Sequence, residues 1–276
     1  DVDIWTNVTL ANILDLEGDK GEVTSLNTYN GNIFCFQQQG TSNILFNSRV
    51  QIPTSDGVPV EISNNYKVDG KRYLSGDLGC INKWSIQVTP SGIYFIESTS
   101  KALYHLSDKG FIPVSDSHGM SAFFDTFSKS NIIWDSDKWK GVKSFYDKNH
   151  NDLYVSDANT SINFSDTLGQ FVSFFDYGGV PAMFNIGDGF YAITNDGTKC
   201  SLWRMFDGEY NNFFGKLKPY DFTFISNSNE GSDKIFTNLL LRADFYQDGV
   251  DKVTTKDGTI DVPYKNRLNS KLFFDY

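Results

Sequence analysis

The sequence predicts an all-β protein in which antiparallel hairpins repeat as the blades of an irregular β-propeller, followed by a further β-rich segment. Three features predict it: the composition, a series of paired strand-like runs, and an aromatic segment. The 276 residues include 28 Asp but only six Glu and seven Ala. Helices favour Ala and Glu, whereas Asp favours turns, and the 24 Phe and 14 Tyr favour strands. We therefore expect few helices, and short ones.

Four pairs of strand-like runs, each joined by turn residues, predict four hairpins. Their first strands align on Ile33, Ile93, Leu153 and Phe190, at intervals of 60, 60 and 37 residues. A propeller blade repeats every ~40 to 50 residues. Insertions near 51–79 and 115–141 would account for the two long intervals. The predicted turns are Gly40-Thr41-Ser42, Ser98-Thr99-Ser100, Asn159-Thr160 and Asp196-Gly197-Thr198.

The aromatic segment 171–184, FVSFFDYGGVPAMF, does not alternate as a half-buried strand should. Phe174 and Phe175 are adjacent, so their side chains point to opposite faces of a strand. A propeller buries both faces of an inner strand between neighbouring blades, and we expect both rings to be core. The rival fold, a β-sandwich, would leave one face of each sheet polar.

The pattern of paired strand-like runs changes after Lys218. We expect a propeller-like segment over 1–218 and the start of a second β-rich unit, possibly a sandwich, over 219–276. The chain begins at Asp1 without an initiator Met and stops in a strand-like run that ends at Tyr276. We expect a fragment of a longer protein, without a membrane-spanning segment.

Side chains for catalysis and metal binding are sparse, which predicts no enzyme, no cofactor and no metal site. Only three histidines are present, and no zinc-ligand spacing, nucleophile elbow or phosphate-binding glycine loop occurs. The stretch 147–152, DKNHND, resembles the start of a calcium loop, but the twelfth position is Ala158, and a turn between strands explains it better. Cys35, Cys80 and Cys200 have no metal spacing, and we expect buried free thiols.

Two functional classes can be weighed from charge and fold analogy. The net charge of −10 opposes nonspecific binding to nucleic acid. Glycoside hydrolysis needs only two carboxylates, and the run from Asn195 to Thr198 with Trp203 faintly matches a sialidase turn. A carbohydrate-binding or glycoside-cleaving propeller is therefore the alternative function.

Three runs resemble one family of virion proteins. They are FVSFFDYGGVPAMFNIGDGFYAITNDG (171–197), DGEYNNFFGKLKPYDFTFISN (207–227) and DKIFTNLLLRADFY (233–246). In these runs the chain is similar to the muzzle, or tail stabilisation, proteins of crAss-like bacteriophages, and the similarity is best over 140–250.

The resemblance implies a structural subunit of the distal tail, assembled in the host cytoplasm, located in the virion and acting through protein contacts around the exit channel. It implies a homo-oligomer that contacts other tail proteins and, transiently, exiting DNA or cargo protein. No catalytic residue carries over. The candidate interface residues, all in the aromatic segment, are Phe171, Phe174, Phe175, Tyr177, Gly178, Gly179, Pro181 and Phe184.

Overall fold

A computed structural model describes most of the chain between residues 13 and 275. The chain forms two compact units, Asp1–Asp207 and Gly208–Tyr276, and each is described by itself. The described residues are 13–46, 49–52, 60–63, 68–97, 99–129, 141–157, 160–177, 182–195, 197–208, 212–218, 231, 238–245, 249–255, 258–264 and 268–275.

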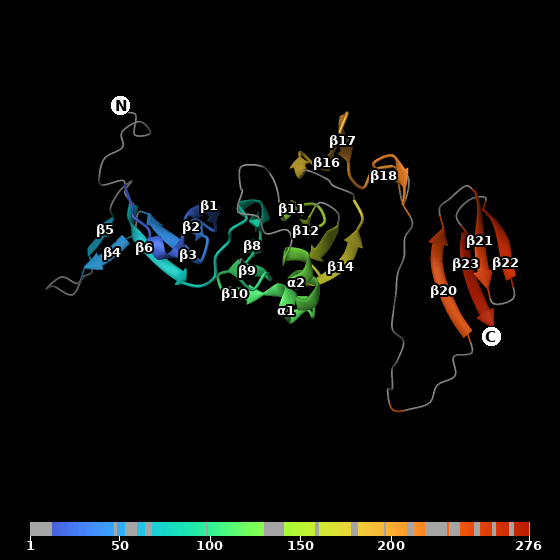
Figure 1. Cartoon of the computed structure of the whole chain (residues 1–276), viewed down its shortest axis with the longest axis horizontal. Coiled ribbons are helices and arrows are strands. Elements are labelled where there is room, and N and C mark those ends of the chain that lie inside the picture. The colour runs from blue at the N-terminus through green and yellow to red at the C-terminus, as the bar shows by residue number, and fades with distance from the viewer. Residues whose placement is uncertain are drawn as a thin grey trace. The chain divides into compact units, whose positions relative to one another are not determined.

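Among the described residues of the first unit, four antiparallel sheets of three or four strands follow one another along the chain, in addition to one two-stranded hairpin (Figure 1). The first sheet contains β1 (Val23–Tyr29), β2 (Asn32–Gln37), β3 (Gly40–Phe46) and β6 (Val68–Ser75). The second contains β7 (Gln87–Thr89), β8 (Gly92–Ile96), β9 (Leu103–Ser107) and β10 (Gly110–Pro113). The third contains β11 (Lys143–Asp147), β12 (Asp152–Ser156), β13 (Ser161–Ser165) and β14 (Gln170–Phe175). The fourth contains β15 (Ala182–Ile186), β16 (Gly189–Asn195) and β17 (Cys200–Arg204).

The all-β prediction is confirmed, and helices are short. In the described part they are α1 (Val114–Ser117), α2 (Ser121–Lys129) and two 3₁₀ turns, Gly18–Lys20 and Lys83–Ser85. None of these helices has the length and apolar character needed to cross a bilayer. A hairpin of β4 (Arg49–Ile52) and β5 (Val60–Ser63) is inserted between β3 and β6. The propeller part of the prediction remains a prediction.

The four predicted hairpins form, but the turn predicted at Gly40-Thr41-Ser42 is wrong. Each of the other three predicted turns includes one residue, Ser98, Asn159 or Asp196, that lies outside the described residues. Gly40, Thr41 and Ser42 lie in β3, and Gly40 pairs with Gln37. The turn is therefore at Gln38 and Gln39. Thr41 and Ser42 are fully buried within β3, and the Thr41 hydroxyl donates to the carbonyl of Leu78 at 2.7 Å. These small polar residues therefore belong to a strand and not to a turn.

The second unit is also built from strands. Its elements are β18 (Asn212–Phe213) paired with β19 (Lys216–Leu217), β20 (Asn238–Phe245) paired with β23 (Leu268–Asp275), and β21 (Gly249–Thr255) paired with β22 (Gly258–Tyr264). The predicted domain division at residue 218 and a sandwich after it remain predictions.

The second sheet is packed on both faces, as its strand β8 shows. Every residue of β8 is buried. Ile93 and Phe95 join Phe34 and Phe36 of the first sheet in one apolar cluster. Tyr94 and Ile96 project to the opposite face and join a cluster with β12 and β13 of the third sheet. The expectation that inner strands lose alternation because both faces are covered is confirmed at β8.

The third sheet packs against the fourth through its other face. The rings of Tyr154 and Phe190 stack with centroids 5.6 Å apart. The Asn185 amide donates to the carbonyl of Tyr146 at 2.7 Å, and the Asn149 amide donates to that of Asp188 at 2.7 Å. The first strands of successive sheets are neighbours, since β1 contacts β7, β7 contacts β11 and β11 contacts β15.

Helices α1 and α2 lie between β10 and β11 in the chain and cover the third sheet near its outer strand (Figure 1). Phe124 of α2 is 1% exposed and joins the cluster between the second and third sheets. Its ring centroid lies 5.7 Å from that of Phe171 on β14. The helical segment therefore fills apolar space beside the outer strand of the third sheet.

Candidate functional site: an aromatic interaction surface

The aromatic segment predicted as an interface forms β14 and β15, which belong to the third and fourth sheets. Gly178, Gly179 and Pro181, three of the candidate residues, lie outside the described residues. The other five have described surroundings, and these differ. Their role in an interface remains a prediction.

Two of the five, Phe175 and Tyr177, pack toward the fourth sheet. Their rings stack with centroids 4.7 Å apart, and the ring of Phe175 lies 5.8 Å from that of Tyr154. Tyr177 is 7% exposed, and burial raises the pKa of its phenol. These two rings belong to the packing of the first unit.

Phe171 packs on the opposite face of β14, among the rings of the helical layer. Its centroid lies 5.1 Å from that of Phe164 and 5.7 Å from that of Phe124. Phe171 is half-buried and packs against the cluster between the second and third sheets. Phe171 therefore stabilises the packing of α2 against the third sheet.

Phe174 is 56% exposed, so the prediction that both adjacent rings are core is wrong for this residue. β14 is the outer strand of its sheet, and among the described strands it pairs with β13 alone, so no further strand of this sheet flanks Phe174. On its face, the ring of Phe123 from α2 lies close, at 5.1 Å between centroids. Val172 is 55% exposed. We call Phe123, Val172 and Phe174 the β14 patch.

A β-bulge lies within the β14 patch. Ser173 pairs with Asn163 and Phe171 pairs with Phe164, which leaves Val172 as the extra residue. A bulge twists an edge strand and discourages pairing with another strand. The patch therefore offers apolar side chains for contact, whereas its backbone edge is protected.

Phe184 on β15 is half-buried, and its ring lies nearly parallel to that of Tyr191, with centroids 6.4 Å apart. Ile186, on the same strand, is 53% exposed. Phe184 and Ile186 lie on one face of the fourth sheet because they are two residues apart. The structure thus places the five described candidates on three surfaces.

The acidic stretch 147–152 forms the turn between β11 and β12, as predicted. Asp147 is fully buried, and its carboxylate lies 2.6 Å from Nδ1 of His150 and accepts the N–H of Asn149 at 2.9 Å. Within the described ranges, no cluster of three or more His, Cys, Asp or Glu side chains is placed to hold a metal ion. The carboxylate of Asp147 stabilises the turn.

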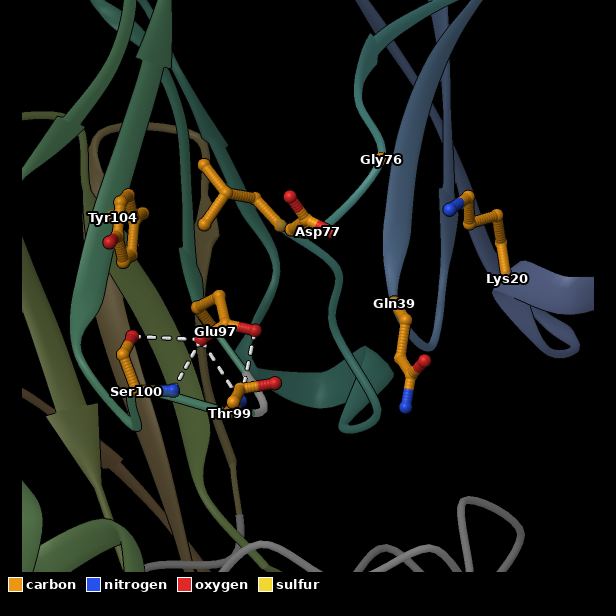
Figure 2. Close-up of a pocket in the computed structure, with 9 residues that line it drawn as sticks. Lys20, Gln39, Gly76, Asp77, Glu97, Thr99, Ser100 and Tyr104 are labelled. Carbon is orange, nitrogen blue, oxygen red and sulfur yellow. Dashed lines mark hydrogen bonds between the residues drawn. The ribbon is translucent and has the colours of Figure 1, made fainter.

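A cavity of about 450 Å³ lies beside the β8–β9 turn (Figure 2). The carboxylate of Glu97, 1% exposed, accepts hydrogen bonds from the N–H groups of Thr99 and Ser100 and from the Ser100 hydroxyl, at 2.5 to 2.9 Å. The carboxylate of Glu97 therefore stabilises the β8–β9 turn. The residues that line the cavity include neither His nor Cys. The lining residues are Lys20, Gln39, Gly76, Asp77, Leu78, Glu97, Thr99, Ser100 and Tyr104.

Two family models match this chain. The model of the crassvirus muzzle protein matches residues 1–196, and that of the crassvirus muzzle protein C-terminal domain matches residues 208–274. The chain belongs to the crassvirus muzzle protein family. The muzzle protein of Bacteroides phage crAss001 is 51% identical over 244 residues, which is 88% of this chain and 17% of that protein. The chain thus spans about a sixth of this family member's length.

Phe123 lies in 115–141, which the repeat spacing predicts to be an insertion, so the sequence does not predict this residue as a member of the β14 patch. A signal was present: Phe123, Phe124 and Phe127 have the i, i+1, i+4 spacing of one helix face. The expectation of buried thiols holds for Cys35 and Cys80 but is wrong for Cys200, which is exposed on an outer strand.

Proposed function

We propose that this chain is a structural part of a phage tail, in a distal muzzle or stabilisation assembly, and acts through protein contacts around the exit channel. The observation that carries the proposal is the match of both family models to the chain. The chain would be a virion component, assembled in the host cytoplasm as a homo-oligomer with other tail proteins. It would have no catalytic role.

The proposed fold of the first unit is a propeller-like array of blades. The first three sheets are antiparallel with four strands each, which is the usual blade architecture. Neighbouring first strands contact one another, while α1 and α2 occupy space near the outer strands of the second and third sheets. In a propeller, the sheets lie close together at their inner strands and farther apart at their outer strands, because they are arranged as blades around an axis.

The β14 patch is the proposed contact surface for a neighbouring tail protein. Aromatic residues concentrate binding energy at interfaces, and Phe174 and Val172 are each more than half exposed. The net charge of −10 would favour passage of DNA without retention, because like charges repel. Contact with exiting DNA or cargo protein would therefore be transient.

Labelling of intact virions tests the location. A tag fused to the protein that contains this chain, detected with nanogold on purified phage, should mark the distal end of the tail. Gold confined to the capsid, or a virion that lacks the tagged protein, would refute the proposal. A Phe174→Glu variant should fold normally yet be incorporated less well than a Leu217→Glu control, since Leu217 is 64% exposed and lies outside the patch.

Carbohydrate binding is the second candidate function, and the cavity in Figure 2 is the observation that favours it. Its lining combines an aromatic ring, Tyr104, with the polar side chains of Gln39 and Asp77. Glycan arrays and glycosidase assays would separate the two functions. Specific sugar binding that Tyr104→Ala abolishes would support the carbohydrate function, whereas an unlabelled array favours the structural one.

A further inference from the structure

The fourth sheet differs from the other three at its outer edge. Among the described residues it has three strands where each of the others has four, and β17 is its last strand (Figure 1). After β17, Phe206 adopts a left-handed backbone conformation with φ of 59° and is 52% exposed. The residues that follow β17 directly therefore do not continue as a fourth strand.

The register of β17 defines which backbone groups face the open edge. The N–H of Met205 donates to the carbonyl of Phe190 at 2.8 Å, in register with the β16–β17 ladder. In an antiparallel ladder, hydrogen-bonded pairs alternate with non-hydrogen-bonded pairs. The backbone groups of Trp203 and Ser201 therefore bond to β16, whereas those of Cys200, Leu202 and Arg204 do not.

It follows that the N–H and C=O groups of Cys200, Leu202 and Arg204 point away from β16. Among the described residues, none is hydrogen-bonded to these outward backbone groups. The side chains of Leu202 and Arg204 are 58% and 56% exposed. The edge thus presents a row of donors and acceptors beside an exposed apolar side chain.

The outer strands of the other three sheets carry features that discourage further pairing. The register of β6 shifts twice against β3, β10 ends at Pro113, which has no N–H, and β14 has the bulge at Val172. In contrast, β17 pairs with β16 in unbroken register and contains no proline. It is a regular, unprotected edge.

We propose that the β17 edge binds the β17 edge of a second copy of this chain, antiparallel, about a two-fold axis at Leu202. This register matches all five residues of the strand, and it places the three outward residues opposite one another as hydrogen-bonded pairs. Leu202 then faces Leu202 of the second copy. Arg204 faces Cys200, so like charges do not lie directly opposite each other.

A two-fold contact of this kind is self-complementary and closes, so it gives a dimer with one continuous sheet of six strands across both copies. Pairing a strand to an exposed edge is an established mode of protein association. The inference goes beyond the proposed tail role, because it uses only the pairing geometry of the fourth sheet and holds or fails independently of where the protein resides.

Sedimentation of the purified chain over a range of concentrations tests the contact. The unmodified chain should reach the mass of a dimer. Leu202→Lys places two ammonium groups opposite each other and should raise the dissociation constant at least about tenfold. Ile186→Lys is the matched control, since Ile186 is 53% exposed on the other edge strand of the same sheet, and it should leave the constant unchanged. A chain that is monomeric throughout overturns the proposal.

Cross-linking tests the register, and it does not depend on how well the lysine variant folds. Leu202 and its symmetry mate would have Cα atoms about 5.5 Å apart, within the range of a disulfide. In a Leu202→Cys, Cys200→Ser variant, mild oxidation should produce a covalent dimer.

The unmodified chain provides the control. Its Cys200 lies four residues out of register with Cys200 of the second copy, at least about 14 Å away, and should not cross-link. Cys35 and Cys80 are buried and should not interfere. A double variant that remains non-covalent, or cross-links no faster than the unmodified chain, refutes this register. A monomeric chain whose Leu202 is protected only by another tail protein would show that the edge serves a foreign strand and would likewise overturn the proposal.

Discussion

The packing of the second sheet between its neighbours can be tested by truncating Phe95 on β8. The ring is fully buried, and its centroid lies 5.0 Å from that of Phe36, 5.9 Å from that of Tyr104 and 6.2 Å from that of Phe111. Truncating a buried Phe to Ala costs about 3 to 5 kcal/mol. Because three rings from two sheets surround the site and would have to collapse together, we expect the upper half of this range for Phe95→Ala.

Phe174→Ala provides the comparison, since it removes the same atoms from the outer strand β14. This side chain is 56% exposed, so it retains less than half of the burial of Phe95. Complete burial of a Phe side chain contributes about 1.5 to 3 kcal/mol, which leaves about 0.7 to 1.3 kcal/mol for Phe174. The two losses should therefore differ by at least about 2 kcal/mol.

Urea unfolding followed by far-ultraviolet circular dichroism measures both free energies, with an unchanged slope as the sign that the unfolded state is the same. Any separate transition of the second unit is common to both variants. Equal losses for the two variants would refute the assignment of β8 to an inner position and of β14 to an outer one.

Three further predictions concern the thiols, a half-buried histidine and the helical layer. Cys200 should react with a maleimide at neutral pH in the folded chain, whereas Cys80, whose pKa burial raises to about 12, should react only on unfolding; mass spectrometry of the labelled peptides checks both. Burial lowers the pKa of His105, which stacks on Tyr94 at 4.2 Å, so the unfolded chain takes up the proton first. The free energy of unfolding should thus fall as the pH drops below about 6.5, and His105→Gln should reduce that slope, while an unaltered slope would contradict the pKa shift. Phe124→Ala should cost about 3 to 5 kcal/mol, and a loss below about 1 kcal/mol would show that α2 does not cover the third sheet.

The strands could be predicted because their sequence signals are local. The runs around Ile33, Ile93, Leu153 and Phe190 are rich in β-branched and aromatic residues and are bounded by turn residues, and each forms a central strand of its sheet. What could not be predicted was the position of a strand within its sheet. The outer strand β14 is as aromatic as an inner one, yet Phe174 is exposed while Phe175, next to it on the same strand, is half-buried.

The β17 edge was beyond sequence reasoning for a similar physical reason. Unpaired backbone N–H and C=O groups along an edge strand leave no mark in the sequence. They depend on whether another strand lies beside the edge and on which residues of the strand form hydrogen-bonded pairs with the neighbour on the other side. Cys200 could not be distinguished from the buried Cys80 by spacing, and its exposure follows from the face of β17 on which it lies, since exposed and half-buried residues alternate along this strand. Sequence therefore predicts which segments are strands, whereas the exposed surfaces depend on long-range pairing.

The most direct test of the proposed function is a cryo-electron microscopy reconstruction of the tail of the phage that encodes this chain. We predict density for the four sheets of the first unit in the distal tail, arranged as blades with β1, β7, β11 and β15 innermost. The β14 patch should be covered by another polypeptide. A map in which this protein is absent from the tail, or in which Phe174 and Val172 face solvent in every copy, would contradict the proposed function.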